Sequence, residues 1–494
     1  MSAAATVPVW PVEGWELVAG LEVHTELSTA TKLFCGCRNA FGDVPNTNTC
    51  PVCLGLPGSL PVLNAEAVEL AARVGVALGS DVRRSLFHRK NYFYPDMPKN
   101  YQVSQYDEPI CVGGSLELPD GVRIGIVRAH LEEDTGKTTH VGGDGRIHGA
   151  SHSLVDYNRA GVPLLEIVSE PDLRSAEQAR AYAAELRAIL VAVGASDGRM
   201  EEGSLRVDAN VSVRRVGDAT LGTRCEVKNL NSLRSLGRAV EHEAARQVAV
   251  LLAGGTVAQE TRHWREDEGR TVAMRSKEEA FDYRYFPEPD LVPVAPDAAL
   301  LERARAAVPM LPAARRARLF GLLSRGGDRD PARAGAPGAQ VAAVVASDLD
   351  QLVAGAVERG AEPALALARV ANEAAAEPDA ARRLDVEAFA HLCRMEAVGE
   401  LSATQAKTVL GVLLAEGGDP AEIAAARGFA ALPAGAVEEF VRSVAAAHPE
   451  EWGRWLAGEE KVAGFLVGRV MRESGGRADG KAVRAVLDAA RSRA

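Results

Sequence analysis

The sequence has no run of about 18 consecutive apolar residues, and it therefore predicts no membrane-spanning helix. Residues 1–13 lack a basic stretch followed by an apolar core, so no secretory signal is expected. The chain also contains neither a Gly-x-x-x-x-Gly-Lys-Ser/Thr phosphate loop nor a dinucleotide-binding glycine fingerprint. Any nucleotide would therefore have to be held by a sheet face and a metal ion.

The composition is that of a globular protein. The 494 residues are enough for roughly three domains, and 47% hydrophobic and 25% charged residues are ordinary proportions. The net charge of −11 argues against a surface that binds nucleic acid by bulk attraction, although it leaves room for a local basic patch. The chain has seven cysteines, four of them closely spaced. This pattern is more typical of a protein in a reducing compartment than of one held together by disulfides. We therefore expect a cytoplasmic protein.

A change of composition near residue 290 predicts the first domain boundary. The join, Pro287–Pro296, holds four prolines in ten residues, which a regular helix does not tolerate. Before it, alternating strand-like runs and Gly-rich turns dominate, and after it the chain is rich in Ala, Arg and Glu at helical spacing. We expect three domains: a first over 1–296, a helical domain over 297–399 and a helical tail over 400–494.

The first domain is predicted to be α+β with a largely antiparallel sheet, because its consecutive strands are often joined by turns rather than by helices. Helices are expected where capping residues and terminal glycines frame apolar periodicity, over residues 65–78, 175–193 and 232–253. Strands are expected over residues 15–26, 122–134, 164–169, 205–214 and 223–228.

Four cysteines form a cluster near the start of the chain, with the spacing Cys-x-Cys, twelve residues, Cys-x-x-Cys: Cys35, Cys37, Cys50 and Cys53. Four thiolates are the number that a tetrahedral structural zinc requires. Four free buried thiols are the simpler alternative, but the tight pairing disfavours it. The spacing therefore predicts a closed, structural Zn²⁺ site, and the scattered Cys111, Cys225 and Cys393 are expected in the core.

A second metal site is indicated by polar side chains that share strand faces. Alternation places Glu22 and His24 on one face of the first strand. The run His130–Asp134 repeats this arrangement with Glu132, and Glu166 stands between apolar strand neighbours. A carboxylate buried in this way is costly unless it is paired or bound to a cation. A surface or salt-bridged role is simpler for any one of these acids, but together they favour a Mg²⁺ site made of hard oxygen ligands.

Two further strands carry polar faces of mixed sign. Arg206, Asp208 and Asn210 alternate with apolar residues on the first, and Glu226 and Lys228 do so on the second. A solvated antiparallel face explains this pattern. A pocket for a phosphorylated, metal-bound substrate also explains it.

Seven motifs resemble the GatB/GatE family, whose members are subunits of the aspartyl/glutamyl-tRNA amidotransferases. They are Gly20–His24, Tyr92–Tyr101, His130–Asp134, Asp156–Arg159, Pro163–Val168, Lys228–Asn231 and Asp282–Asp290. The similarity is dense in the first domain, weaker in the helical domain and partly regained in the tail.

The resemblance implies a catalytic cradle similar in fold to glutamine synthetase and the guanido kinases. Such a protein uses ATP and Mg²⁺ to phosphorylate the side-chain carboxylate of Glu or Asp misacylated on tRNA(Gln) or tRNA(Asn). Ammonia from a separate amidase subunit then displaces the phosphate, and a small third subunit steadies the heterotrimer. The chain carries no Ser-cis-Ser-Lys amidase or Cys-His glutaminase signature, which fits ammonia supplied by a partner. No membrane or DNA partner is expected.

The family motifs also imply roles for individual residues. Carried over to this chain, the Mg²⁺ ligands are His24, Glu132 and Glu166, with Glu22 as a substrate-facing acid beside them. Nucleotide and acceptor-end contacts are implied for seven further polar residues: Arg206, Asp208, Asn210, Glu226, Lys228, Asn229 and Asn231.

Two other functions compete with this one. A non-enzymatic tRNA-binding scaffold would use both metals for folding alone, and a freestanding ligase acting on small carboxylates would need no RNA-binding tail. Residues 461–494 hold eight Lys or Arg against three acidic residues, which favours an RNA partner and disfavours the freestanding ligase. The motifs do not distinguish Asp-tRNA(Asn) from Glu-tRNA(Gln) as the substrate.

Overall fold

The computed structural model describes residues 7–142, 149–274, 283–324, 335–429, 435–475, 478 and 480–492. The chain divides into two compact units, Met1–Ala313 (unit 1) and Ala314–Ala494 (unit 2). Two parts of the sequence predictions lie outside the described residues. They are the first six residues of the chain and Asp282, which opens the last family motif.

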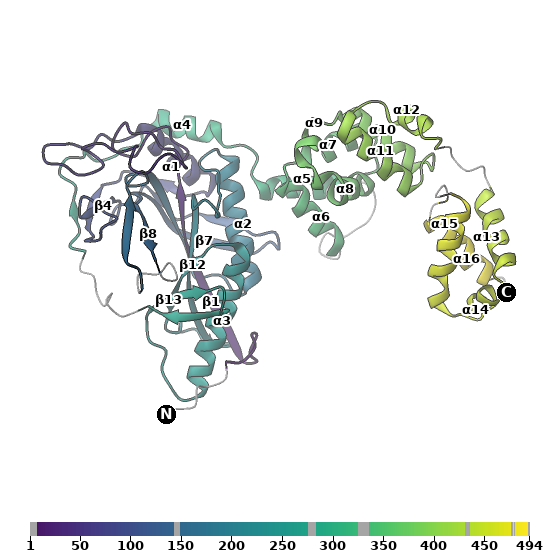
Figure 1. Ribbon diagram of the computed structural model, residues 1–494, viewed down its shortest axis with the longest axis horizontal. Coiled ribbons are helices and arrows are strands. Elements are labelled where there is room, and N and C mark those ends of the chain that lie inside the picture. Colours follow the sequence, from purple (N-terminus) through teal and green to yellow (C-terminus); the bar gives the residue numbers. More distant parts are fainter. Residues whose placement is uncertain are drawn as a thin grey trace. The chain divides into compact units, whose positions relative to one another are not determined.

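Unit 1 is built on one large sheet (Figure 1). Its strands are β1 (Trp15–Glu26), β2 (Asp81–Val82), β3 (His88–Asn91), β4 (Tyr101–Ser104), β5 (Cys111–Val112), β6 (Ser115–Glu117), β7 (Arg123–Glu133), β10 (Pro163–Ser169), β11 (Leu205–Arg215), β12 (Cys225–Leu230), β13 (Thr261–Arg265), β14 (Arg270–Ala273) and β15 (Phe286–Pro287). The strand order is β14-β13-β12-β11-β1-β10-β7-β4-β3-β15, and β2, β5 and β6 lie off this path. A separate hairpin joins β8 (Lys137–Val141) to β9 (His152–Asp156).

The predicted α+β class is confirmed, because the sheet is antiparallel at nearly every pairing. Among the described strands, only β12 and β13 run parallel. The pairings that matter most for function, β11 with β1, β1 with β10 and β10 with β7, are all antiparallel.

Helices α1 (Ala65–Ala77), α2 (Ala176–Ala192) and α3 (Leu233–Leu252) cover one face of this sheet (Figure 1). Each begins where the sequence predicts, after a residue whose side chain accepts hydrogen bonds from the first turn: Asn64, Ser175 and Ser232. A fourth helix, α4 (Ala298–Ala307), packs on α1, and its Arg303 Nη2 lies 3.1 Å from Glu69 Oε2.

Alternation along the strands separates an apolar face from a polar one. Leu21 and Val23 of β1 point into the core shared with the helices and are each 1% exposed. Glu22 and His24 therefore lie on the opposite face of the strand. The register between β10 and β7 shifts at Val168/Ser169, so the alternation of β7 changes phase along the strand.

The rest of the chain is helical wherever the structure describes it. The helices are α5 (Pro312–Ser324), α6 (Gly335–Ala346), α7 (Asp350–Glu358), α8 (Pro363–Asn372), η2 (Ala374–Ala376), α9 (Pro378–Arg383), α10 (Val386–Ala397), α11 (Ala403–Glu416), α12 (Pro420–Ala426), α13 (Ala436–Ala447), α14 (Pro449–Leu456), η3 (Glu460–Val462), α15 (Ala463–Glu473) and α16 (Gly480–Arg491). Among the described residues, no single helix is long and apolar enough to cross a membrane. One pair, Gly338–Ala346 with Asp350–Glu358, meets the length and composition criteria jointly but is bent by 113°.

Packing places the domain boundaries later than composition predicted. Unit 1 extends to Ala313, because α4 packs on α1 instead of beginning a new domain after residue 296. One helical core runs from Leu319 to Ala424, and the predicted break after residue 399 falls inside it. A second helical core spans Val441–Leu487. Composition did not reveal the shared core, because the helices on both sides of residue 399 have the same Ala- and Leu-rich character.

The strand β10 provides a test of the two faces. We expect Ile167→Ala, on the buried face, to destabilise unit 1 by about 2–5 kcal/mol, because it removes a fully buried side chain and leaves a cavity. Val168→Ala, one residue along on the polar face, should cost much less. Amide hydrogen exchange in β1 and β10, followed at increasing urea concentration, measures the loss of stability in each variant. Equal losses in the two variants would contradict the assignment of faces.

Candidate metal centres

Three strands bring one imidazole and two carboxylates together on the polar face of the sheet. The β1–β10 register sets His24 opposite Glu166, and the β10–β7 register sets Glu166 opposite His130. His24 Nε2 lies 3.3 Å from Glu166 Oε2 and 3.8 Å from Glu132 Oε1. One ligand atom each from His24, Glu132 and Glu166 lies within 4.8 Å of the other two. We call these three residues the cation cluster, because one divalent cation can be reached by all of them.

The electrostatics of the cluster centre on Glu166. Burial opposes its ionisation, but the charge of His130 and the hydrogen bond from His24 outweigh this and hold the pKa of Glu166 well below its usual range. Burial also disfavours the His24 imidazolium, but the hydrogen bond and charge of Glu166 raise the pKa of His24 to about 9. Without a metal the cluster therefore holds a proton on His24, which a cation would have to displace.

Two residues beside Glu166 were not assigned a role from the sequence. His130 Nε2 lies 3.6 Å from Glu166 Oε2, and its buried Nδ1 has no hydrogen-bond partner among the described residues. Arg128 Nη2 lies 3.7 Å from Glu166 Oε1. Alternation predicted that His130 shares a strand face with Glu132, and the regular register from Glu166↔His130 to Val168↔Arg128 continues that face to Arg128.

The predicted substrate-facing residues form a charged strip beside the cluster. Asn210 Nδ2 donates a hydrogen bond of 2.9 Å to Glu22 Oε1. Burial and the charge of Glu166 raise the pKa of Glu22. Next to it, Lys228 Nζ lies 3.2 Å from Asp208 Oδ2 and 3.0 Å from Glu226 Oε1. These side chains come from three neighbouring strands, β1, β11 and β12, and they offer both signs of charge.

Arg206 belongs to a second network at the end of the cluster. Its Nη2 lies 2.8 Å from Asp134 Oδ2, and Arg159 Nε approaches the same oxygen at 3.4 Å. Burial opposes ionisation of Asp134, but the two guanidinium groups lower its pKa. Burial and the charge of Asp134 raise the pKa of Glu26 to about 7.

The two remaining predicted residues lie at the exposed end of β12. Asn229 has a left-handed backbone (φ 68°), which interrupts the strand alternation there. Its Nδ2 donates to the Trp264 carbonyl at 3.0 Å, and Asn231 Nδ2 donates to Asn229 Oδ1 at 3.2 Å. The structure does not bring these two amides into the cation cluster.

The four cysteines meet as predicted. Cys35, Cys37, Cys50 and Cys53 each present a sulfur atom within 4.8 Å of the others, a donor set that suits a metal such as zinc. The hydrogen bond from Cys35 lowers the pKa of Cys53 to about 5, and the same contact raises the pKa of the Cys35 thiol far above its usual range. The four sulfurs thus cannot all ionise together without a cation, which is the behaviour expected of a metal-binding set.

A buried lysine and two asparagines connect this cysteine loop to the strands of the cation cluster. The fully buried Lys32 points its Nζ at Cys53 Sγ (3.8 Å) and at the Tyr157 carbonyl (3.2 Å). The Asn46 amide N–H donates to Asp156 Oδ1 at 2.9 Å, and the Tyr157 N–H donates to Asn46 Oδ1 at 2.8 Å. The Asn48 N–H donates to Asn158 Oδ1 at 2.8 Å. The cysteine loop therefore holds the segment that leads into β10, the strand of Glu166.

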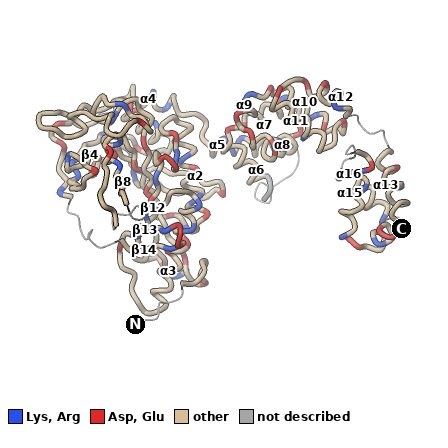
Figure 2. Tube along the Cα trace, viewed as in Figure 1, with Lys and Arg blue, Asp and Glu red and all other residues tan. Residues whose placement is uncertain are grey.

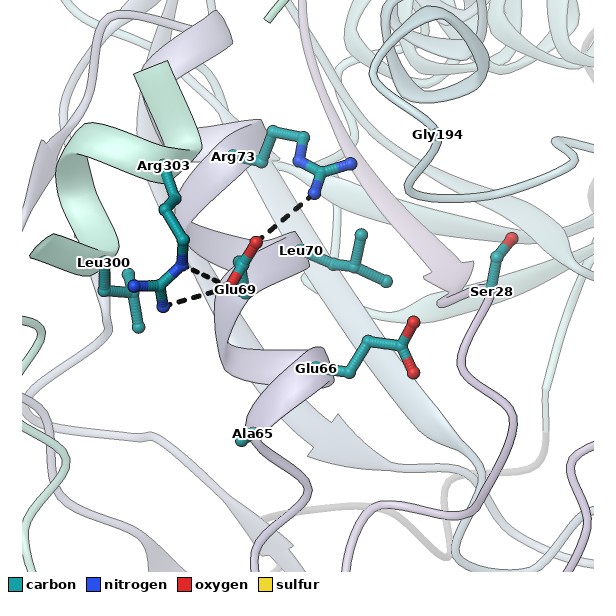
Figure 3. A pocket seen from close by; sticks show the side chains of 9 residues that line it. All are labelled: Ser28, Ala65, Glu66, Glu69, Leu70, Arg73, Gly194, Leu300 and Arg303. Atoms are coloured by element: carbon teal, nitrogen blue, oxygen red, sulfur yellow. Dashed lines mark hydrogen bonds and ion pairs between the residues drawn. The ribbon is translucent and has the colours of Figure 1, made fainter. Parts of the chain in front are cut away.

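A cavity of about 430 Å³ opens between α1 and α4 and contains none of the predicted site residues (Figure 3). Glu69 bridges Arg73 and Arg303 across it, at 3.5 Å and 3.1 Å. Its other lining residues are Ser28, Ala65, Glu66, Leu70, Gly194 and Leu300. Both arginines that line it are already paired with Glu69.

A sheet whose polar face gathers an imidazole, two carboxylates and a mixed-charge strip defines a candidate metal-dependent, sheet-based catalytic domain. Comparison with known families agrees: the GatB/GatE catalytic domain matches residues 17–302, and a GatB domain matches residues 351–490. The chain belongs to the GatB family.

Curated relatives match along nearly the whole chain, and all three below are named as the GatB subunit of aspartyl/glutamyl-tRNA(Asn/Gln) amidotransferase. The protein of Frankia casuarinae is 50% identical over 96% of this chain and 95% of its own length. That of Anaeromyxobacter dehalogenans is 49% identical over 97% of this chain and 99% of its own. That of Thermobifida fusca is 48% identical over 98% of this chain and 96% of its own.

Elemental analysis tests the thiolate site. We expect about one zinc ion per purified chain, because four converging sulfurs satisfy a tetrahedral ion. Cys50→Ser should lose most of this zinc, whereas Cys393→Ser, which alters a buried cysteine in unit 2, should retain it. Zinc-free wild-type protein, or equal zinc in the two variants, would contradict the assignment.

The raised pKa of His24 predicts how cation binding depends on pH. A cation needs neutral imidazole, but His24 is protonated below pH 9 in the metal-free chain, so affinity should rise by up to about tenfold per pH unit between pH 6.5 and 9. Titration calorimetry with Mg²⁺ measures this slope, and His24→Gln should remove it. An affinity that does not change over this range would show that His24 is not a ligand.

Proposed function

We propose that this chain is the carboxylate-activating subunit of a tRNA-dependent amidotransferase. In this function, ATP phosphorylates the side-chain carboxylate of Glu or Asp carried by tRNA(Gln) or tRNA(Asn), and ammonia then replaces the phosphate. The observation that supports it best is the cation cluster on the polar face of a sheet that matches the GatB/GatE catalytic domain. The name of the relatives states the same overall activity for those proteins.

The cluster residues fit the requirements of a Mg²⁺ site. His24, Glu132 and Glu166 would hold the ion, and one buried and one partly buried carboxylate beside an imidazole are a donor set that a hard divalent cation satisfies. Mg²⁺, when bound, supplies positive charge that reduces the repulsion between the γ-phosphate and the attacking carboxylate. The substrate carboxylate needs no general base, because it is already an anion at neutral pH.

The chain's own side chains would orient the two anionic substrates. Glu22, held by Asn210, lies beside the cluster, and it would repel a misplaced carboxylate while accepting hydrogen bonds from the amino group of the aminoacyl substrate. Lys228 is the cation of the neighbouring strip and would neutralise phosphate oxygens. Arg206, paired with Asp134, would hold the far end of the strip in place.

The smaller polar residues complete this proposal. Asp208 and Glu226 would orient Lys228, and Asn229 and Asn231 would act at the rim of β12 as contacts to the nucleotide or acceptor end. The fold likeness to glutamine synthetase and the guanido kinases is part of the same proposal. So is a structural role for Zn²⁺, since four sulfurs leave no open coordination position for chemistry.

The proposed reaction takes place in the cytoplasm and requires partner proteins and tRNA. A separate amidase subunit would supply ammonia, a small third subunit would complete a heterotrimer, and the helical part of the chain would bind the tRNA body. Acidic and basic residues are interspersed in the last helices (Figure 2), where Arg484 Nη2 lies 2.8 Å from Glu460 Oε2. Lys461 and Arg472 have no ion-pair partner among the described residues and remain available to phosphates.

The decisive variant removes one charge from the cluster. We expect Glu166→Gln to lower ATP-dependent phosphorylation of Glu-tRNA(Gln) or Asp-tRNA(Asn) by at least about a hundredfold, because it removes the negative charge that binds the cation and pairs with His24. The matched control is Glu170→Gln, which changes an exposed glutamate one residue past β10 and should retain activity.

The same pair of variants separates the enzyme from an inactive scaffold. If a folded Glu166→Gln protein phosphorylates the aminoacyl-tRNA at the wild-type rate, the cation cluster serves folding only and the catalytic role is contradicted. Binding of tRNA by both variants shows that the fold is intact.

A further inference from the structure

Aromatic residues are scarce in this chain, yet they gather at one edge of the sheet of unit 1. They make up only 5% of the sequence, which contains eight tyrosines. Six of these lie on or beside β3, β4 and β15: Tyr92, Tyr94, Tyr101, Tyr106, Tyr283 and Tyr285. Tyr101 packs against the helix-covered core, but the other five do not belong to it, so core packing does not explain their concentration at this edge.

Two of these rings form a stacked pair. The centroids of Tyr106 and Tyr285 are 3.9 Å apart, and their planes differ by 10°. Tyr283 meets Tyr285 edge-on, with centroids 5.9 Å apart. Tyr106 is 52% exposed, so this aromatic pair is open to solvent on one side. Stacked aromatic rings that face water are the arrangement on which nucleobases stack in nucleic-acid-binding proteins.

Strand register places this pair at the border of the cation cluster. Ser104 of β4 lies opposite Glu132 of β7, and Tyr106 follows two residues later. Between them, Gln105 forms two hydrogen bonds with Leu131. Its side-chain Oε1 accepts from the Leu131 N–H at 2.9 Å, and its own N–H donates to the Leu131 carbonyl at 3.2 Å. Burial and the charges of neighbouring groups, Glu132 and Glu166 among them, raise the pKa of Tyr285.

The other half of the pair is also held firmly. The Asn91 N–H and Nδ2 donate to the Tyr283 carbonyl at 3.0 Å and 2.8 Å, and Nδ2 donates to the Arg284 carbonyl at 3.0 Å. Arg284 adopts a left-handed backbone (φ 43°), which costs free energy for a residue with a side chain. This conformation lies between Tyr283 and Tyr285, whose rings meet edge-on.

The surroundings carry the charge that a nucleotide requires. Lys90 Nζ lies 4.9 Å from the Tyr283 ring centroid, and no carboxylate of the described chain is within ion-pair distance of it. The Arg89 guanidinium lies 4.3 Å from the Tyr101 ring centroid, although Glu288 also pairs with it. Cations next to open aromatic faces complement a base that carries a phosphate.

We propose that the Tyr106–Tyr285 pair is a platform for a nucleobase of a substrate bound at the cation cluster. This inference rests on the proposed function, which brings two nucleobase-bearing substrates to the cluster: ATP and the 3′ end of the aminoacyl-tRNA. The exposed face of Tyr106 stacks on the base, and Lys90 lies near its phosphate.

Substitution of Tyr106 tests the platform in the assembled amidotransferase. Tyr106→Ala should raise the KM for one of the two substrates by about 5- to 150-fold, the equivalent of about 1–3 kcal/mol for one stacked base, with little change in kcat. Tyr106→Phe retains the ring and should recover the lost affinity. Phe41→Ala, which removes another exposed ring on the cysteine loop, is the matched control and should change neither KM.

The two substrates give separate outcomes. A raised KM for ATP assigns the base to ATP, and a raised KM for the misacylated tRNA assigns it to the acceptor end. Direct binding of ATP and of uncharged tRNA to the full-length chain gives the same comparison without turnover.

Wild-type affinity of Tyr106→Ala for both ligands would overturn the platform. So would an equal loss in Tyr106→Phe, because that variant keeps the stacking surface. Failure of the proposed function shows differently, as a wild-type complex that binds ATP and tRNA but phosphorylates no aminoacyl group.

Discussion

A largely buried carboxylate, 14% exposed and shared between two imidazoles, organises the polar face of the sheet. Glu166 sits on the central strand β10, with His24 on one neighbouring strand and His130 on the other. An isolated carboxylate at this depth would be strongly disfavoured, so its stability depends on the positive charge around it. In the metal-free chain the charge of His130, a proton on His24 and the Arg128 guanidinium supply it, and a divalent cation can replace the proton on His24. The strip of Glu22, Asp208 and Lys228 continues the same face.

The cysteine loop supports this face from outside it. Its sulfurs form a closed site, and its asparagines bond to the segment Asp156–Asn158, which leads into β10. Arg159 continues the connection, since its guanidinium donates to the Thr135 carbonyl at 2.9 Å, next to Asp134. The cysteine loop, which is the more conspicuous candidate metal site in the sequence, therefore affects the geometry of the cation cluster. A metal that performs no chemistry can still affect the rate when it positions the strand that carries Glu166.

Local patterns in the sequence predicted most of unit 1. Capping residues predicted the helix starts at Asn64, Ser175 and Ser232, and the structure agrees. Alternation predicted that Glu22 and His24 share a strand face, which the structure also shows. Features that depend on pairing between distant strands were not accessible. The contact of Arg128 with Glu166 needs β10 to pair with β7, and the stacking of Tyr106 on Tyr285 needs the order β7-β4-β3-β15; no local signal encodes either pairing. The boundary predicted after residue 399 falls within one helical core, because a core shared between helices leaves no mark in composition.

Pulsed electron paramagnetic resonance of the Mn²⁺-loaded chain tests the central claim most directly, because it detects imidazole nitrogen bound to the ion. The account predicts a nitrogen coupling from one directly ligated imidazole that disappears in His24→Gln and persists in His130→Gln. A wild-type spectrum without nitrogen coupling, or a coupling that survives in His24→Gln, would show that the cation is not held by His24, Glu132 and Glu166.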